Sequence, residues 1–410
     1  MRFVYTIVLR LLLPLILLRL WWRGRREPGY REGIPERFGF YTGERPERVI
    51  WVHAVSVGES RAAAPLVRAL GQAYPDHTIL MTCTTAAGRD TIKQVYGESV
   101  MVAFLPYDYP ESVQSFIERW QPRLGILMET EIWPNLLARC AADGIPVVLA
   151  NARMSEKSAR GYQRWSVLSR PAIGSLAAVC AQSEADAGRL RALGAPRVEV
   201  TGNLKFDVTL DAAQLAAGRE WKAKVGRPVL LLASTREGEE KLLLNELKDT
   251  SFLTVVVPRH PQRFDDLASV SQSRRTRARL PDPKDHVHLG DTMGEMAFYY
   301  AACDVAVIGG SFMPLGGQNL IEALAAGAPV VFGPSMFNFS EAARLALEAG
   351  AAVQASDAAA ALLEAEKLLS DPEKRRRMSA AGKALCEAHR GATQKHLAVL
   401  KAAVLTAMRG

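Results

Sequence analysis

The sequence lacks the patterns that bind metals or build disulfide frameworks. Its five cysteines are odd in number and widely scattered, and its seven histidines form no HExxH or comparable cluster. No cysteines stand at the spacing of zinc ligands. These absences argue against a structural zinc site and against a disulfide-stapled secreted domain. They favour reduced, packed cysteines in a cytosolic body.

Internal repeats, long low-complexity segments and a GxGxxG dinucleotide fingerprint are also missing. Hydrophobic residues make up 49% of the 410 residues and charged residues 23%, a globular composition with room for two or three domains. Acidic residues are the scarcer charge, 43 against 51 lysines and arginines, which leaves a net charge of +8. This excess predicts an anionic partner. By itself it leaves nucleic acid, anionic lipid and a phosphorylated substrate open.

The most apolar stretch is residues 1–22, and four arginines follow within the next nine residues. Trp21 and Trp22 stand where a cleaved signal peptide would need small residues. Arg10 costs about 3 kcal/mol at mid-span, but the many leucines and isoleucines return about 0.3–0.6 kcal/mol each. Residues 1–22 are therefore predicted to be a membrane anchor, either spanning or lying in the plane of the membrane, with the body on the cytoplasmic side.

From residue 48 onward, short apolar runs alternate with amphipathic helical patterns. The expected strands before the midpoint are Val49–Val55, Thr78–Thr84, Met101–Pro106, Leu124–Met128, Pro146–Ala150, Ala177–Ala181 and Val198–Thr201. Those after it are Pro228–Leu232, Leu253–Val257, Val287–Leu289, Val305–Ile308 and Pro329–Phe332. This rhythm is typical of βαβ units in a doubly wound parallel sheet. It predicts an α/β protein with two Rossmann-like domains.

The predicted domain boundaries follow from these runs. The anchor at 1–22 precedes a first domain at 30–207 and a linker at 208–225, and the second domain covers 226–356. The alanine-rich segment 357–410 is expected to form helices that pack back across both domains.

Residues 304–334 form the densest pattern in the chain: a strand, a glycine-rich loop, a helix from Gln318 to Ala326, a glycine stop and another strand. Such a helix start offers unpaired N–H groups to an anion. Asn319 is expected in the first turn, and Glu322, one turn further, could accept hydrogen bonds from a ribose. Any βαβ unit contains a loop of this kind, so the spacing alone leaves nucleotide binding and an ordinary turn open.

Polar residues follow several of the expected strands, where ligands bind in open parallel sheets. Glu59 begins the helix expected at Arg61–Tyr74, as a dipole-stabilising residue or as a general base. Glu129 comes directly after a strand, and Lys205 lies in the segment that ends the last strand of the first domain, where it can reach a charged group.

Cationic residues suited to phosphate follow other strands. Arg153 and Arg160 lie in a basic stretch with interleaved aromatic residues, which is either a solvated helix face or a site for a phosphate-bearing acceptor. In the second domain Arg259 stands between prolines in a stiff turn suited to bidentate contact with phosphate. A further helix start is expected at Gly294.

Seven motifs, in order and spanning nearly the whole chain, together resemble the 3-deoxy-D-manno-octulosonic acid (Kdo) transferase family. They are His-Ala-Val-Ser-Val-Gly-Glu, Glu-Thr-Glu-Ile-Trp-Pro-Asn, Ala-Asn-Ala-Arg-Met-Ser, Gly-Asn-Leu-Lys-Phe-Asp, Pro-Arg-His-Pro-Gln-Arg-Phe, Gly-Asp-Thr-Met-Gly-Glu and Gly-Gly-Gln-Asn-Leu-Ile-Glu. The resemblance implies the two-Rossmann-domain (type B) glycosyltransferase fold. It also implies inverting transfer of Kdo from CMP-Kdo to a phosphorylated lipid A precursor, at a bacterial inner membrane and without nucleic acid, cofactor or metal. The sequence indeed has no Asp-x-Asp motif.

The resemblance also implies roles for single residues. Glu59 becomes the proton acceptor on the lipid hydroxyl, and Glu129 and Lys205 stabilise the transition state. The CMP-Kdo site comprises Pro258, Arg259, Met293, Gly294, Glu295, Asn319, Leu320, Ile321 and Glu322. The basic stretch supplies Arg153 and Arg160 to the acceptor.

Two other functions remain. Another type B sugar-nucleotide transferase or epimerase would share the fold, but it would not explain the hydrophobic N-terminus or the basic stretch at 153–165. A non-enzymatic membrane adaptor that senses a nucleotide would need no base at Glu59.

Overall fold

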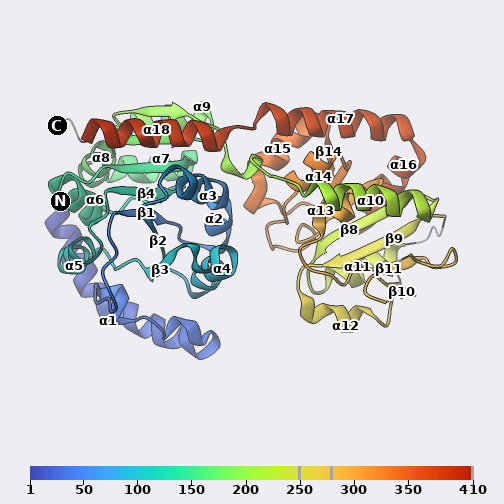
Figure 1. The fold of residues 1–410 in the computed structure, drawn as a ribbon, viewed down its shortest axis with the longest axis horizontal. Coiled ribbons are helices and arrows are strands. Elements are labelled where there is room, and N and C mark those ends of the chain that lie inside the picture. The colour runs from blue at the N-terminus through green and yellow to red at the C-terminus, as the bar shows by residue number, and fades with distance from the viewer. Residues whose placement is uncertain (248–250, 278–279, 408–410) are drawn as a thin grey trace. The chain divides into compact units, whose positions relative to one another are not determined.

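The computed structural model describes residues 1–247, 251–277 and 280–407. The chain divides into two compact units (Figure 1). Unit 1 comprises Met1–Asp207 and the segment from Gly391 onward, and unit 2 comprises Val208–Arg390. Each unit is a parallel seven-stranded sheet covered by helices, so the predicted pair of Rossmann-like α/β folds is confirmed.

The sheet of unit 1 has the order β3-β2-β1-β4-β5-β6-β7. Its strands are β1 Val49–His53, β2 Thr78–Cys83, β3 Met101–Phe104, β4 Leu124–Met128, β5 Val147–Ala152, β6 Ala178–Ala181 and β7 Val198–Val200. They lie where the apolar runs predicted them, with ends that differ by a few residues. The strand order reverses between β1 and β4, which pair in parallel. In such sheets the ligand site lies at this reversal.

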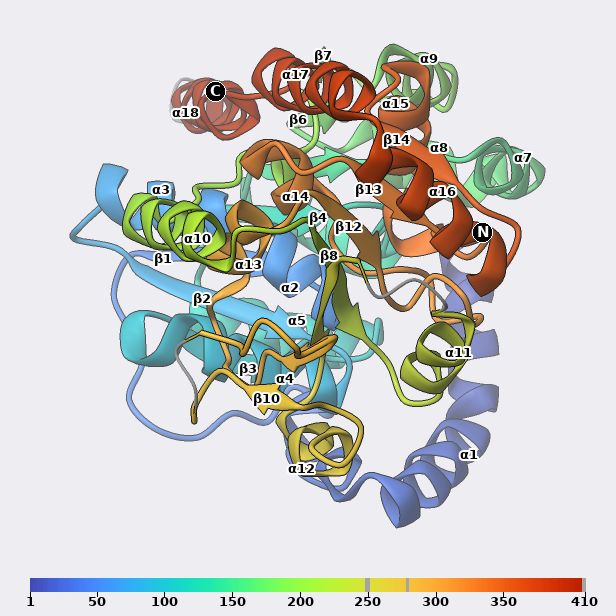
Figure 2. The same cartoon turned by 90° about the vertical axis from the view of Figure 1, so that its right-hand side faces the viewer.

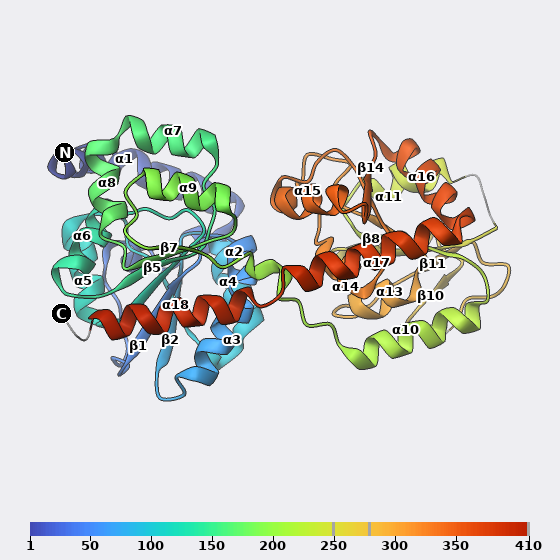
Figure 3. The same ribbon diagram turned by 90° about the horizontal axis from the view of Figure 1, so that it is seen from above.

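Helices cover both faces of this sheet. One face buries α3 Ala64–Ala73, α4 Ala86–Tyr96 and α18 Ala392–Ala407 (Figure 3). Helix α2, Val57–Ala62, packs against α4. The other face buries α5 Pro110–Trp120, α6 Pro134–Ala142, α8 Ser166–Gly174 and α9 Glu184–Ala192. The helix expected at Arg61–Tyr74 is two helices, because Pro65 near the start of α3 has no N–H to donate to the preceding turn.

The N-terminal helix α1, Arg2–Arg26, curves along unit 1 and contains Pro14 (Figures 1 and 2). Its most apolar window has a mean hydropathy of 2.1 and is 11% buried, so its length and composition would allow it to cross a membrane. Its first half is nevertheless tied to the body. Asn135 Nδ2 donates to Thr6 Oγ1 at 3.0 Å, and the Tyr109 hydroxyl donates to the carbonyl of Leu9 at 2.9 Å.

The sheet of unit 2 has the order β10-β11-β9-β8-β12-β13-β14. Its strands are β8 Val229–Thr235, β9 Leu253–Pro258, β10 Ser273–Arg274, β11 Val287–Leu289, β12 Val305–Ile308, β13 Val330–Phe332 and β14 Ala352–Gln354. The edge strands β10 and β14 were not expected, because they are two and three residues long and carry no apolar run. The order reverses between β8 and β12, which again marks the ligand edge.

Eight α-helices are found in the part of unit 2 that the structure describes. They are α10 Ala212–Val225, α11 Glu239–Glu246, α12 Phe264–Leu267, α13 Met296–Ala302, α14 Ile321–Ala326, α15 Ser340–Glu348, α16 Ala358–Ser370 and α17 Pro372–Ala388. The expected linker at 208–225 is mostly α10, which packs against α13. Gly218 permits this close contact, because a Cβ there would lie 2.3 Å from the carbonyl oxygen of Phe298.

The glycine-rich segment differs in one respect from its prediction. Helix α14 begins at Ile321 instead of Gln318, so Asn319 precedes the helix and is not in its first turn. Asn319 Oδ1 accepts the N–H of Ile321 at 3.0 Å, a side-chain turn that competes with helix formation. Gly316 and Gly317 before it have positive φ, which also holds the loop out of the helix.

Candidate active site

Two carboxylates meet at the ligand edge of the unit 1 sheet. Glu59 lies in the first turn of α2, just after β1, and Glu129 directly follows β4. Because β1 and β4 are paired and parallel, the chain leaves both strands at the same edge. Glu129 has a φ of 58°, a strained value for a residue with a Cβ. Such strain is characteristic of functional sites, and here it turns the chain sharply at the strand end.

The Glu59 carboxylate is held by the turn before α2. Oε2 accepts the N–H of Val55 at 2.8 Å, and the Ser56 hydroxyl donates to Oε1 at 3.0 Å. Ser56 also accepts the N–H of Glu59, so the two residues form a reciprocal cap of the capping-box type. The Glu59 side chain therefore caps the start of α2, and the same hydrogen bonds fix the direction of its carboxylate.

The protonation of Glu59 is unusual for a glutamate. Burial, followed by the negative charge of Glu129, raises its pKa from 4.5 to about 7, with a smaller contribution from Glu131. The hydrogen bonds from Val55 and Ser56 act in the opposite direction. A carboxylate with a pKa close to neutrality is well matched to accept a proton from a hydroxyl.

Lys205 brings a positive charge to this cluster. Its Nζ lies 3.6 Å from Glu129 Oε1, and both side chains are largely shielded from solvent. Glu131 is held by Trp133, whose Nε1 donates to Glu131 Oε2 at 2.8 Å. The three sequence-predicted residues Glu59, Glu129 and Lys205 are thus brought to one edge of one sheet.

Asn151 and His396 support this edge, and neither was predicted. Asn151, with φ of 52°, accepts the N–H of Leu204 on its Oδ1 at 3.0 Å, next to Lys205. Its own N–H donates to Nε2 of His396 in α18 at 2.9 Å. Burial lowers the pKa of His396 to about 4, so the ring is neutral and Nε2 can accept. These residues are 245 positions apart, a separation that leaves no local signal in the sequence.

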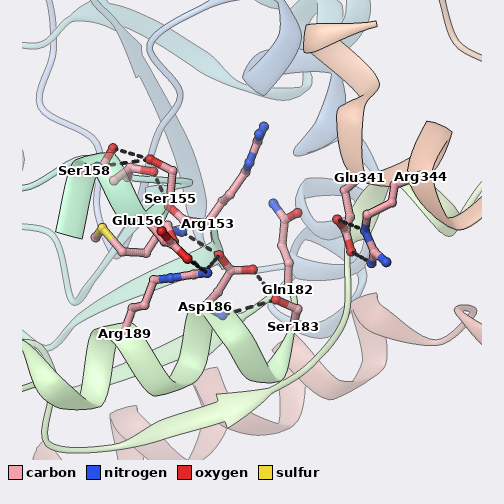
Figure 4. A network of polar contacts seen from close by, with 12 residues as sticks. Arg153, Ser155, Glu156, Ser158, Gln182, Ser183, Asp186, Arg189, Glu341 and Arg344 are labelled. Atoms are coloured by element: carbon pink, nitrogen blue, oxygen red, sulfur yellow. Dashed lines mark hydrogen bonds and ion pairs between the residues drawn. The ribbon is translucent and has the colours of Figure 1, made fainter. Parts of the chain in front are cut away.

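The two arginines expected to bind the acceptor lie in different surroundings. Arg153 follows β5, and its carbonyl oxygen accepts from Thr130 Oγ1 at 2.5 Å, which connects it to the Glu129 loop. Figure 4 shows its side chain extending away from the contacts that join Glu156 and Asp186 to Arg189. Arg160 lies on the surface helix α7, Glu156–Arg164, with 75% of its side chain exposed and Glu156 at 3.0 Å.

Unit 2 has a cavity of about 310 Å³ at the ligand edge of its own sheet. Five predicted donor-site residues line it: Pro258, Arg259, Met293, Gly294 and Glu322. Pro258 ends β9, and the Met293–Gly294 turn follows β11. The cavity thus has the position that the strand-end rule assigns to a ligand.

The remaining predicted donor residues do not line this cavity. Glu295 binds Arg275 at 2.7 Å and accepts from the Thr292 hydroxyl, and the Arg275 guanidinium lowers its pKa. Asn319 Nδ2 donates to Glu322 Oε1 at 2.8 Å and so orients a lining carboxylate. Leu320 and Ile321 are fully buried, so their side chains belong to the core.

Two further residues, Ser234 and Gln214, line the donor-side cavity, and a third, Glu239, holds the glycine-rich loop. Ser234 lines the cavity with a φ of 56°, at an irregularity between β8 and β9. Gln214 donates from Nε2 to the carbonyl of Gly294 at 3.0 Å. Buried Glu239 accepts the N–H groups of Gly310, at 2.5 Å, and Phe312, at 3.0 Å, and so fixes the glycine-rich loop. The acidic residues after β8 were a visible signal for Glu239, but its partners lie more than 70 residues away.

Comparison with known proteins adds to this geometry. Residues 32–208 match the family described as 3-deoxy-D-manno-octulosonic-acid transferase (kdotransferase), and residues 272–385 match glycosyl transferases group 1. The chain is 46% identical to the 3-deoxy-D-manno-octulosonic acid transferase of Bordetella pertussis, over 98% of this chain and 99% of that one. It is 37% identical to the protein of that name from Haemophilus influenzae, over 98% of each.

Among solved structures, UDP-GlcNAc 2-epimerase from Neisseria meningitidis matches with a TM-score of 0.55 and 16% identity. The match covers 86% of this chain and 99% of that one. At this identity the likeness concerns the fold alone.

Proposed function

Because the chain belongs to the 3-deoxy-D-manno-octulosonic acid (Kdo) transferase family and is therefore a glycosyltransferase, we propose that it moves Kdo from CMP-Kdo to the phosphorylated lipid A precursor lipid IVA. The reaction joins a lipid hydroxyl to the anomeric carbon of Kdo with inversion and releases CMP. The observation that carries this proposal is the Glu59 carboxylate, fixed at the ligand edge of its sheet with a pKa of about 7.

In this proposal Glu59 is the general base. Its raised pKa allows it to take the proton of the attacking hydroxyl near neutral pH, a contribution worth typically ~10²–10⁴ in rate. The two hydrogen bonds from Val55 and Ser56 keep the carboxylate in a single orientation, which reduces the reorganisation needed for proton transfer.

Glu129 and Lys205 stabilise the transition state. Attack on the anomeric carbon produces an oxocarbenium-like centre, while negative charge grows on the departing CMP phosphate. The Glu129 carboxylate suits the positive centre and the Lys205 ammonium suits developing negative charge. Their separation of 3.6 Å supports a pair that acts together.

Unit 2 supplies the donor half. The 310 Å³ cavity offers Arg259 to phosphate and Glu322 to sugar hydroxyls, and a Kdo carboxylate would also suit a guanidinium. We propose metal-independent transfer, in which arginine and lysine stabilise the charge for which other glycosyltransferases use a divalent cation. The remaining predicted CMP-site residues would contribute through the backbone or by orienting these two side chains.

The acceptor half is unit 1, with Arg153 and Arg160 as phosphate-binding residues. Helix α1 and the arginines that follow residue 22 support association with a bacterial inner membrane, the body being on the cytoplasmic side.

The direct test is incubation of the full-length protein in detergent with CMP-Kdo and a tetraacylated lipid A precursor, followed by mass spectrometry of the lipid. We expect a mass increase of one or more Kdo residues, and we expect it to persist in EDTA. Binding of labelled CMP-Kdo without any transfer would instead support a nucleotide-sensing adaptor. Transfer that disappears in EDTA and returns with Mg²⁺ would contradict metal independence.

A further inference from the structure

Besides the donor-side cavity of unit 2, the structure has a cavity in unit 1 that the proposed chemistry does not use. It lies between α1 and the α7–α8 hairpin. It measures about 650 Å³. Val4 and Val8 of α1 form one wall, Gly161 and Leu168 of the hairpin form the other, and Ile132 and Pro134 lie between them. We call this cavity the α1–α8 pocket. Its volume is within the range of small-molecule sites, roughly 300–1,000 Å³.

The polar contacts of α1 explain why the pocket is open. The bonds from Asn135 to Thr6 and from Tyr109 to Leu9 hold the helix against α5 and α6. Held in this way, α1 leaves Val4 and Val8 about half exposed, at 51% and 47%. Apolar walls that stay in contact with water are unfavourable, so an apolar occupant would be stabilised there.

The composition around the pocket indicates the chemistry of that occupant. The walls are mostly apolar, built from aliphatic side chains and aromatic rings, which suits a hydrocarbon chain. Helix α7 also carries Lys157, Arg160 and Arg164, none of which lines the pocket. Basic residues on a helix whose other face borders an apolar cavity suit an acyl chain attached to a phosphate-bearing head group. Trp165 and Val167, at 65% and 68% exposure, extend the apolar surface from the hairpin.

The pocket is also connected to the candidate active site. One loop carries Glu129 and Glu131 at the sheet edge and then supplies Ile132 and Pro134 to the pocket. The Tyr162 hydroxyl, from a residue that lines the pocket, donates to the carbonyl of Thr130 at 3.4 Å. A chain seated in the pocket would therefore hold its head group on the side of the sheet that carries Glu59.

We propose that the α1–α8 pocket binds one fatty acyl chain of the lipid acceptor. This inference rests on the proposed lipid acceptor, and it gives α1 a second role: the helix is one wall of the acceptor site as well as an anchor. The acceptor would be recognised through its acyl chain as well as through its phosphates.

Gly161 provides a variant that fills the pocket without disturbing the fold. It lies within α7 with φ outside the left-handed region, and a Cβ there would meet no atom within 4 Å. Gly161→Leu should therefore fold, since leucine favours a helix over glycine. Gly188→Leu in α9 is the matched control, because its Cβ is equally unobstructed and Gly188 does not line the pocket.

The first experiment does not depend on turnover. Full-length protein is irradiated with a lipid A precursor whose acyl chain carries a terminal diazirine, and the labelled peptides are identified by mass spectrometry. We expect labels on α1 and the α7–α8 hairpin, displaced by unlabelled precursor, reduced about tenfold or more in Gly161→Leu and unchanged in Gly188→Leu. Labels confined to other helices, or equal labelling of both variants, would overturn the proposal.

The second experiment measures transfer to acylated and fully deacylated precursors. Gly161→Leu should raise KM for the acylated precursor about tenfold, with no change in KM for CMP-Kdo or in kcat/KM for the deacylated one. Equal effects on both acceptors would refute an acyl-chain site. If the pocket is labelled but no Kdo is transferred, the acyl site stands and the proposed function fails. If Kdo is transferred but the pocket is not labelled, the proposed function stands and the acyl site fails.

Discussion

The most informative prediction concerns the pH dependence of Glu59. If this carboxylate is the general base, the rate depends on the fraction of molecules in which it is ionised. With a pKa of about 7, that fraction is ~9% at pH 6 and ~91% at pH 8. We therefore expect kcat/KM to fall about tenfold between pH 8 and pH 6, with a slope of one per pH unit on the acid side. An ordinary glutamate with a pKa of 4.5 would give almost no change over this range.

The neighbours of Glu59 make the prediction more specific. Glu129 and Glu131 both raise the pKa of Glu59, and Glu129 has the larger effect. Glu129→Gln should therefore move the acid limb to lower pH, and Glu131→Gln should move it less. Ser56→Ala removes a hydrogen bond that favours the charged form and should move the limb to higher pH. Each of the three variants keeps Glu59 itself, so its residual rate still reports the titration.

The assay is initial-rate transfer at subsaturating acceptor and saturating donor, from pH 5 to pH 9, with CMP release measured in parallel. Glu59→Gln is expected to lose about two orders of magnitude or more and to show no acid limb. The same limb in Glu59→Gln would refute the assignment of the titration to Glu59. Near-wild-type turnover by this variant, once its folding is verified, would remove Glu59 from the mechanism.

The remaining predictions concern the donor site, the acceptor site, the glycine-rich loop and helix α1. Arg259→Ala should weaken CMP binding in calorimetry, whereas Arg160→Ala should weaken only the acceptor; the reverse result would exchange the roles of the two units. Glu239→Gln should raise KM for CMP-Kdo. A lower melting temperature with an unchanged KM would make Glu239 merely structural. A chain starting at Glu27 should fold, since α1 contributes no strand to either sheet. It should turn over detergent-dispersed acceptor with a raised KM, because it lacks the α1 wall of the α1–α8 pocket, and it should work poorly on acceptor embedded in a bilayer. Equal activity of the truncated and full-length proteins on bilayers would contradict an anchoring role.

The sequence predicted the central strands well because each is buried on both faces and therefore reads as a continuous apolar run. Strand β12, Val305–Ile308, was predicted to the residue. The edge strand β10 has no such run, because an edge position does not require one. The start of α14 was missed for a different reason. A hydrogen bond between the Asn319 side chain and the backbone N–H of Ile321 competes with the helix. The pattern of residues shows that Asn319 can make this bond but not that it does so.

The same contrast holds for the candidate site. The meeting of Glu59 and Glu129 at one sheet edge could be predicted because a parallel sheet delivers its strand ends to one edge, a rule that needs only the strands. The contact of His396 with Asn151 could not, because α18 returns to unit 1 only after the whole of unit 2. The apolar pocket was equally hidden, since its walls come from three distant segments that a one-dimensional pattern does not connect.

The contribution of Glu59 to the stability of the folded protein bears on the mechanism. A carboxyl whose folded pKa lies above its unfolded value binds more protons in the native state between pH 4.5 and pH 7. Its contribution to stability is therefore lost as pH rises through that window, and the charged Glu59 is destabilising where the enzyme would work. Glu59→Gln retains an acceptor for the Val55 N–H and removes this charge. It should melt at the same temperature as the wild type or higher at pH 8, with the difference shrinking toward pH 5. A clear loss of stability of Glu59→Gln at pH 8 would mean that the carboxylate serves chiefly as a cap for α2. A base that is held at a cost in stability requires the opposite result: the variant is inactive, but its fold is as stable as that of the wild type.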